Sequence, residues 1–368
     1  MLAGDSSVSQ LVPMNAGPTG GDYRVVQIHP TLRCNLRCLH CYSLSGPQER
    51  TSLAIESLTR ALAGVASEGY NAVGISGGEP LMYEGLPDLL SAAKSLSLIT
   101  TLTTNGSLLT RERLASLASY VDLFAVSVDG VEASHNRIRG SSRAFGAMRR
   151  GLAFLRDAGR PFGLIFTLTM HNLHELEQVA AFAAEEGAAL LQLHPLEETG
   201  RAQIELKRSA PDDTELAYAF LEVARLRRRH AGRGLKIQLD VADRSVLRVN
   251  PERAFAHDAL SSELAAQLPL AHLVAPIVIE GDGAVVPLQY GFGRFYTIGD
   301  ITRESLKDAA ARWRQWAYEP FMALCRSVYD LHVAPGDQRF FNWYGAVTTA
   351  SLLPNQVAAR TGPSSTPD

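Results

Sequence analysis

Cysteine is scarce in this chain, and long hydrophobic runs are missing. Only four cysteines occur among 368 residues, and three of them lie close together, which is a poor basis for a disulfide framework. No stretch of about 20 apolar residues is present, so the sequence predicts no membrane span. The opening residues, MLAGDSSVSQ, lack the basic and apolar regions of a secretory signal. We therefore expect a cytoplasmic protein with no membrane partner.

An excess of one charge is also missing. Lys and Arg number 35 and Asp and Glu number 38, which gives a net charge of -3 at pH 7. This balance favours neither nucleic acid nor an anionic membrane as a partner. The basic run 225–230 is the local exception, and its amphipathic setting is typical of a solvated helix face. With 46% hydrophobic residues, the chain can bury one full-sized core and a smaller second unit.

Strand-like and helix-like segments alternate about six times in the first part of the chain. This alternation predicts a parallel sheet with crossover helices, either doubly wound or a partial barrel. In both folds the chemistry gathers at the carboxyl ends of the strands. The expected strands are 24–29, 72–76, 99–104, 123–128, 163–169 and 190–194, and the expected helices include 53–68, 86–96, 110–119 and 173–186.

The pattern changes in the second half of the chain. Residues 212–230 are typical of a long helix and 235–241 of a strand, while IEGDG (279–283) indicates a hairpin turn. The aromatic run FFNWY (340–344) is interpreted as core, with the flank of a substrate groove as the alternative. The residues from about 362 onward have a disordered composition.

Three cysteines follow the first expected strand, in HPTLRCNLRCLHCYS. Cys34, Cys38 and Cys41 have the spacing C-x3-C-x2-C. Thiolates are the usual ligands of a [4Fe-4S] cluster, and three of them leave one iron open to bind and reduce a methionine-type ligand. A zinc site that adds His40 or Cys325 is the alternative, but the chain lacks the second C-x2-C knuckle of common zinc sites.

The spacing resembles that of the radical S-adenosylmethionine (SAM) superfamily. The resemblance implies one [4Fe-4S] cluster on Cys34, Cys38 and Cys41 and SAM as the second cofactor. It implies a fold of class α/β, a partial (β/α)6 TIM-like barrel. The implied activity is reductive cleavage of SAM followed by abstraction of a hydrogen atom from a substrate. An electron donor such as flavodoxin or ferredoxin is implied as a partner.

Later expected strand ends carry residues that the resemblance assigns to SAM. In the turn SGGEP, Gly77, Gly78 and Glu79 are implied to bind its amino group, since glycines allow close backbone approach. His40 is implied to pack against adenine, with a solvent-facing loop position as the alternative. Asx-turn capping is the alternative for Asn105 and Asp129, and a surface position is the alternative for Arg139. These further contacts are Asn105, Ser127, Asp129 and Arg139.

The C-terminal part resembles a SPASM or twitch extension that has lost its cysteines. Leu288 stands where relatives have a cysteine after Pro287, and Val328 replaces the partner of Cys325 in the closing pair. One thiolate cannot hold an auxiliary cluster. We therefore expect a smaller α+β domain without such a cluster, and Cys325 as a buried or idle thiol.

The sequence also predicts a substrate class and a division of the chain into five parts. The SPASM-like framework favours a ribosomally synthesised peptide as the substrate, modified during its maturation. A small metabolite or cofactor precursor is the alternative substrate, and a non-catalytic scaffold or binding protein is the alternative of another class. The parts are a flexible tail (1–21), a radical SAM core barrel (22–204), a helical and strand bridge (205–268), a SPASM-like domain (269–335) and a C-terminal extension (336–368).

Overall fold

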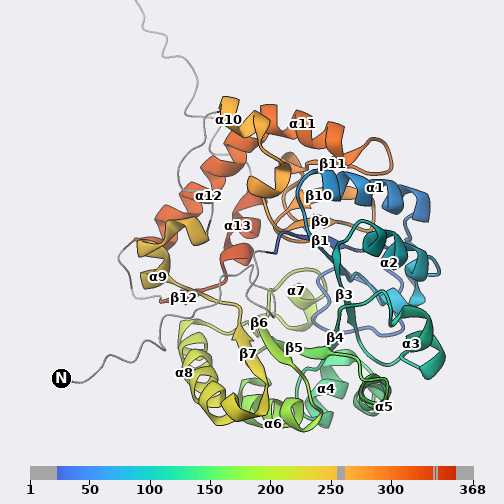
Figure 1. Cartoon of the computed structure of the whole chain (residues 1–368). Coiled ribbons are helices and arrows are strands. Elements are labelled where there is room, and N and C mark those ends of the chain that lie inside the picture. The colour runs from blue at the N-terminus through green and yellow to red at the C-terminus, as the bar shows by residue number, and fades with distance from the viewer. Residues whose placement is uncertain (1–22, 255–261, 335, 337–338, 354–368) are drawn as a thin grey trace, which may run out of the picture.

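The structure is a computed structural model that describes residues 23–254, 262–334, 336 and 339–353. The flexible tail expected over 1–21 and the disorder expected from 362 onward lie outside these residues. A ten-stranded sheet runs through the middle of the molecule, and helices surround it (Figure 1). Among the helices described, none combines the length and the apolar composition needed to cross a bilayer.

Seven parallel strands form the larger part of the sheet, in the order in which they occur along the chain. Each pairs in parallel with the next, which confirms the predicted α/β fold. The sheet stays open, because no pairing joins β7 to β11 (Gly299–Asp300) within the part of the chain that is described. The strands are β1 (Val25–Ile28), β2 (Ala72–Ile75), β3 (Ile99–Thr104), β4 (Leu123–Ser127), β5 (Phe162–Leu168), β6 (Leu190–Pro195) and β7 (Lys236–Leu239).

Crossover helices follow these strands and cover the outer face of the sheet (Figure 1). On α1 (Ile55–Ser67), Leu58, Leu62 and Val65 recur at helical spacing and are buried. Burying each such side chain stabilises the fold by about 1.5–3 kcal/mol. The other helices of this layer are α2 (Leu86–Ser95), α3 (Arg111–Leu117), α4 (Glu132–Arg139), α5 (Ala144–Asp157), α6 (Leu176–Glu185) and α8 (Asp213–His230).

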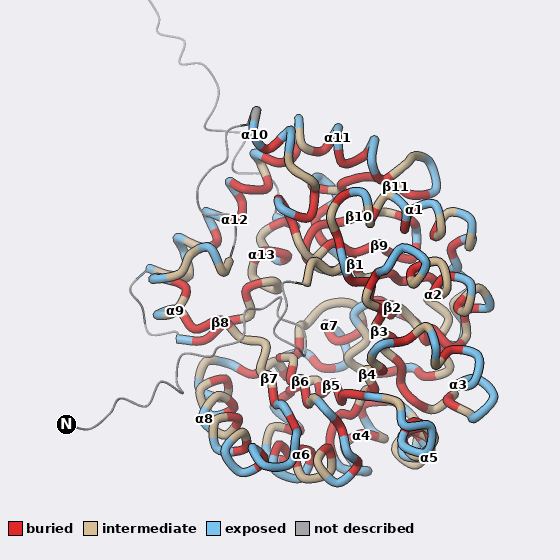
Figure 2. Tube along the Cα trace, in the orientation of Figure 1, coloured by how far each residue is buried: buried red, intermediate tan, exposed pale blue. Residues whose placement is uncertain are grey.

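Burial along the strands shows which face carries the site. All four residues of β2 are buried, whereas β3 and β4 alternate between buried and half-buried residues (Figure 2). Near the carboxyl ends of these two strands, the half-buried Thr103 and Ser127 line a cavity. The period of two along a strand thus places apolar residues in the core and polar residues toward the cavity.

The C-terminal strands continue the same sheet. β9 (Ile277–Ile279) pairs in parallel with β1, and β10 (Ala284–Pro287) pairs antiparallel with both β9 and β11 (Gly299–Asp300). The hairpin predicted at IEGDG is therefore confirmed. The strands of the expected second domain (269–335) therefore belong to the same sheet as those of the barrel, since β9 pairs with β1. The division into separate domains stays a prediction.

The remaining elements close one side of the barrel. Cys325 lies on α12 (Tyr318–Val333) and is 1% exposed, and burial raises the pKa of its thiol to about 12. Its predicted burial is confirmed. β8 (Ala242–Asp243) pairs antiparallel with β12 (Phe340–Phe341). The helices are α7 (Ala202–Glu205), α9 (Arg244–Val249), α10 (Ser262–Gln267), α11 (Leu306–Trp316), α12 (Tyr318–Val333) and α13 (Trp343–Ser351).

Candidate functional site

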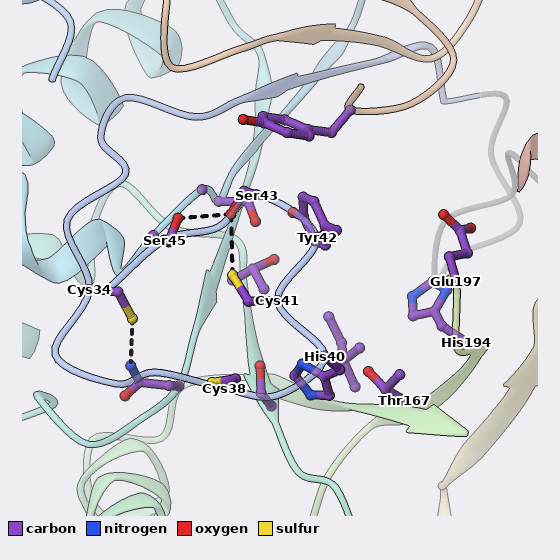
Figure 3. A pocket seen from close by; sticks show the side chains of 18 of the residues that line it. Cys34, Cys38, His40, Cys41, Tyr42, Ser43, Ser45, Thr167, His194 and Glu197 are labelled. Carbon is purple, nitrogen blue, oxygen red and sulfur yellow. Dashed lines mark hydrogen bonds between the residues drawn. The ribbon is translucent and has the colours of Figure 1, made fainter. Parts of the chain in front are cut away.

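A cavity of about 330 Å³ opens at the carboxyl ends of the parallel strands. The loop after β1 forms one wall, and residues that follow β6 lie across from it (Figure 3). Most of the predicted site residues meet here, as expected for parallel strands, whereas Glu79 and Asp129 do not line the cavity. The predicted residues in its wall are Cys34, Cys38, His40, Cys41, Gly77, Gly78, Asn105, Ser127 and Arg139.

The three cysteines of the loop form a donor set that suits a cluster. Burial raises the pKa of the Cys34 thiol to about 12 and also raises the pKa of Cys38, so both thiols ionise readily only beside a bound cation. In the described chain no three His, Cys, Asp or Glu side chains are placed to share one metal ion. Three thiols of one loop that line the same cavity are the donor set that a [4Fe-4S] cluster with one open iron requires.

Arg201 fixes the shape of the cysteine loop. Its guanidinium is buried and donates to the carbonyl oxygens of Cys38 (2.7 Å), Ser45 (2.9 Å) and Leu44 (3.2 Å). Its backbone N–H donates to the carbonyl of Cys41 at 2.9 Å. Sequence reasoning did not select this residue, although it lies in the TGRA segment that follows β6.

The turn after β2 packs directly on the same loop. The backbone N–H of Gly78 donates to the carbonyl of Thr31, and that of Glu79 donates to the carbonyl of Arg33, each at 2.8 Å. A Cβ atom on Gly78 would lie 2.1 Å from the Arg33 carbonyl oxygen. The structure therefore requires glycine here for contact between two backbone segments, whatever ligand the turn binds.

Gly78→Ala is expected to destabilise the protein by about 1–3 kcal/mol, because the new methyl group must push the turn away from the loop. Gly232→Ala is the matched control, since a Cβ at Gly232 meets nothing within 4 Å, and it is expected to change stability by less than about 0.5 kcal/mol. Urea unfolding of both variants provides the measurement. Equal stability of Gly78→Ala and wild type would show that the two segments are not packed as described.

Glu79 is a positioning residue in this structure. Its carboxylate is buried and accepts hydrogen bonds from the Thr104 hydroxyl at 2.7 Å and from the backbone N–H of Asn105 at 2.8 Å. It also accepts from the backbone N–H of Leu81 at 3.2 Å. The side chain thus ties the turn after β2 to the end of β3, and only its backbone neighbours in the turn reach the cavity.

Asp129 holds two cavity residues from behind the wall. Its Oδ2 accepts from Arg139 Nε at 2.5 Å and from His40 Nε2 at 3.1 Å. Burial opposes ionisation of Asp129, but the charges of Arg139 and His40 outweigh it and hold the pKa of this carboxyl well below its usual range. Arg139 Nη1 lies 3.7 Å from Cys38 Sγ, so the network brings positive charge to a thiol.

Asn105 is placed between the cysteine loop and a turn. Its Nδ2 donates to Asn35 Oδ1 at 2.9 Å and lies 3.9 Å from Cys34 Sγ. Its Oδ1 accepts from the backbone N–H of Ser107 at 3.0 Å, which is the Asx turn considered as the alternative. Asn105 therefore caps a turn and faces the cavity at once, and its contact with SAM stays a prediction, like that of Ser127.

A second group of polar residues lies across the cavity from the cysteines (Figure 3). His194 Nδ1 pairs with Asp240 at 2.5 Å, and Gln192 and Gln238 also donate to Asp240. Burial lowers the pKa of His194, but Asp240 and then Glu197 outweigh it and raise the pKa above its ordinary value. His194 lines the cavity, and nothing in the sequence around it indicates Asp240 as its partner.

Asp240→Asn is expected to lower the pKa of His194, because the variant loses the adjacent negative charge. Since the folded-state pKa is raised, the stabilisation from this pair is complete below the unfolded-state pKa of about 6.5 and is lost as pH rises through the folded-state pKa. Histidine NMR titration of the wild type and the variant, with His194→Gln to assign the signal, checks this. Identical pKa values in both proteins would contradict the pairing.

Comparisons with known proteins agree with this geometry. Residues 28–183 match the model of the radical SAM superfamily. The Fe-coproporphyrin III synthase of Methanosarcina barkeri is 30% identical over 244 residues, 62% of this chain and 60% of that protein. The sporulation killing factor maturation protein SkfB of Bacillus subtilis is 27% identical over 53% of this chain and 48% of that protein. Streptococcus suis SuiB bound to precursor peptide SuiA has a TM-score of 0.62 at 17% identity, over 81% of this chain and 66% of that chain.

Residues 28–183 of the chain are thus similar to the radical SAM superfamily. Members of this superfamily use a [4Fe-4S] cluster and SAM, which fits the thiols and polar strand ends described above. The likeness to SuiB shows the fold. The chain spans about half to three fifths of the length of the two curated relatives.

Proposed function

We propose that this protein is a radical SAM enzyme that holds one [4Fe-4S] cluster on Cys34, Cys38 and Cys41 and modifies a ribosomally synthesised peptide. The observation that carries this proposal is that three thiols of one loop share a cavity with the ends of β2, β3 and β4. When bound, the cofactors supply an electron that cleaves SAM and a 5'-deoxyadenosyl radical that takes a hydrogen atom from the substrate. Flavodoxin or ferredoxin is the proposed external donor of that electron.

The chain's own residues orient the reactants and exclude water. Arg201 keeps the cysteine loop in one shape, and Arg139 places a positive charge beside Cys38. The backbone at Gly77 and Gly78 lines the cavity, where it is proposed to bind the amino group of SAM. The other proposed SAM contacts in the cavity wall are His40, Asn105, Ser127 and Arg139.

The substrate class is the finer part of this proposal. Similarity to SkfB and the fold shared with SuiB support a peptide, whereas similarity to an Fe-coproporphyrin III synthase supports a cofactor precursor as the second candidate. The wall across from the cysteines carries the carboxylate of Glu197 and the imidazole of His194, which is paired with Asp240. A tetrapyrrole brings carboxylates of its own, which this wall would repel. This charge balance favours the peptide.

Co-expression with short peptides encoded beside the gene tests the substrate class. We expect mass spectrometry to show a changed mass in one of these peptides, and no change when the Cys34→Ala variant replaces the wild type. Unchanged peptides, together with conversion of a tetrapyrrole precursor by the same protein, would establish the second candidate instead.

Iron content tests the predicted absence of an auxiliary cluster. Anaerobic reconstitution is expected to give about four irons per chain, because one [4Fe-4S] cluster uses three of the four cysteines. Cys325 lies on α12 and does not line the cavity. An iron content clearly above that value would show a second cluster and would contradict the interpretation of the C-terminal region as cysteine-depleted.

A further inference from the structure

Glu197 presents a carboxylate to the cavity, and the side chains that donate hydrogen bonds to it are neutral. Its carboxylate accepts from Asn342 Nδ2 at 2.6 Å and from Gln289 Nε2. Both donors are neutral amides. Within the described residues, no lysine or arginine forms a salt bridge with Glu197. Neutral donors do not cancel the charge of a carboxylate, so a cationic ligand can still pair with it.

The two amides are themselves held in one orientation by α13. Gln289 Oε1 accepts from the Thr348 hydroxyl at 3.2 Å, which leaves its Nε2 directed to Glu197. Asn342 Oδ1 accepts from the backbone N–H of Gly345 at 3.1 Å, as the cap of α13. The C-terminal part of the chain thus fixes a carboxylate that belongs to the barrel. Fixed polar groups of this kind lower the cost of ordering a binding site.

The neighbouring His194 does not neutralise Glu197. Its Nδ1 is paired with Asp240 at 2.5 Å, so a protonated His194 already has a carboxylate partner. Glu197 is then the carboxylate on this wall that is left to pair with a ligand. A group that binds here from the cavity is expected to carry the opposite charge.

Two tyrosine rings lie in the wall of the same cavity. The ring centroids of Tyr42 and Tyr290 are 5.4 Å apart and their planes are inclined by 60°. Tyr290 also stacks on His29 with centroids 4.9 Å apart, which fixes its ring. Tyr42 is 38% exposed, so its ring is accessible from the cavity. Faces of aromatic rings attract ammonium and guanidinium groups.

We propose that Glu197, Tyr42 and Tyr290 form a subsite that binds a cationic group of the substrate, an ammonium or a guanidinium. The inference rests on the proposed function for the presence of a substrate and specifies its chemistry. Glu197 lies across the cavity from the cysteines, whereas Tyr42 directly follows Cys41 in the cysteine loop (Figure 3). A carboxylate-rich substrate does not meet these requirements, whereas a peptide with a basic side chain does.

Direct binding of small probes to the reconstituted protein tests this subsite. The protein is loaded with saturating SAM, without reductant, and titrated with n-butylammonium, n-butanol and butyrate by ligand-observed NMR. We expect the amine to bind most tightly and butyrate most weakly. Glu197→Gln should weaken amine binding about tenfold, as expected for the loss of one charged hydrogen bond. Tyr290→Leu should weaken it about threefold and provides a second test if Glu197→Gln does not fold.

Glu198→Gln is the matched control. This neighbouring carboxylate accepts from the backbone N–H groups of Ser209 and Ala210 and does not line the cavity, so amine affinity should stay within about twofold. Butyrate binding as tightly as the amine, or unchanged amine binding by Glu197→Gln, would overturn the proposal. The amine titration is repeated without SAM, and amine binding that occurs only in the absence of SAM would also overturn the proposal, because Glu197 would then serve SAM. The assay needs no turnover, so a failure of SAM cleavage leaves its result intact.

Discussion

Replacing Cys34, Cys38 or Cys41 with alanine is expected to reduce bound iron to background and to abolish the formation of 5'-deoxyadenosine. The physical reason is that three thiolates bind three irons of a [4Fe-4S] cluster and leave the fourth open. Each variant removes one of these three ligands. Two of the thiols are buried, so water cannot easily substitute for a missing sulfur. Iron and sulfide analysis after anaerobic reconstitution provides the measurement, followed by chromatography of the SAM cleavage products.

Cys325→Ala is the control for these variants. Its side chain is 1% exposed, against 7% for Cys34 and Cys38, so its replacement creates a packing defect at least as large as theirs. Because Cys325 lies on α12 outside the cavity, this variant should retain the iron and the activity of the wild type. Retained SAM cleavage in Cys34→Ala, or loss of iron in Cys325→Ala, would contradict the assignment of the cluster ligands.

Asp129→Asn is expected to destabilise the protein by about 3–5 kcal/mol, because it leaves the buried Arg139 without its charge partner. Asp129 is fully buried and Arg139 is 8% exposed, so water cannot replace the lost carboxylate. The same variant frees His40, whose ring is held by Asp129 at 3.1 Å. Chemical unfolding measures the loss of stability, and iron retention reports the consequence at Cys38.

Asp157→Asn is the matched control for that measurement. Its carboxylate pairs with Arg111 at 2.7 Å, but both side chains are more than half exposed, so the variant should cost less than about 1 kcal/mol. If both variants lose a similar amount of stability, the buried ion pair between Asp129 and Arg139 does not stabilise the protein as described.

The strands of the barrel could be predicted closely because their sequences are short, apolar and bounded by turn residues. β3 was expected at 99–104 and spans Ile99–Thr104, and α8 was expected at 212–230 and spans Asp213–His230. The helices α4 and α5 were not predicted. In α4, polar and charged residues outnumber apolar ones, so its periodicity is weak, and tertiary contacts stabilise it instead.

The candidate site divides into a local and a non-local part. The cysteines and the glycine turn lie in short motifs, so their spacing alone predicted the cluster loop. Glu197, Gln289 and Asn342 come from three distant segments, and only the closure of the C-terminal part on the barrel brings them together. The run FFNWY shows the same limit, because Trp343 is buried core as interpreted, whereas Asn342 in the same run reaches the cavity wall through Glu197.

The most direct test of the account is whether the reconstituted protein cleaves SAM. The wild type, with a full complement of iron, is incubated anaerobically with dithionite and SAM, and 5'-deoxyadenosine and methionine are quantified. We expect both products in equal amounts from the wild type and neither from Cys34→Ala. If the iron-loaded wild type forms no 5'-deoxyadenosine, the central claim is wrong, and the chain is a scaffold that retains the fold of a radical SAM enzyme.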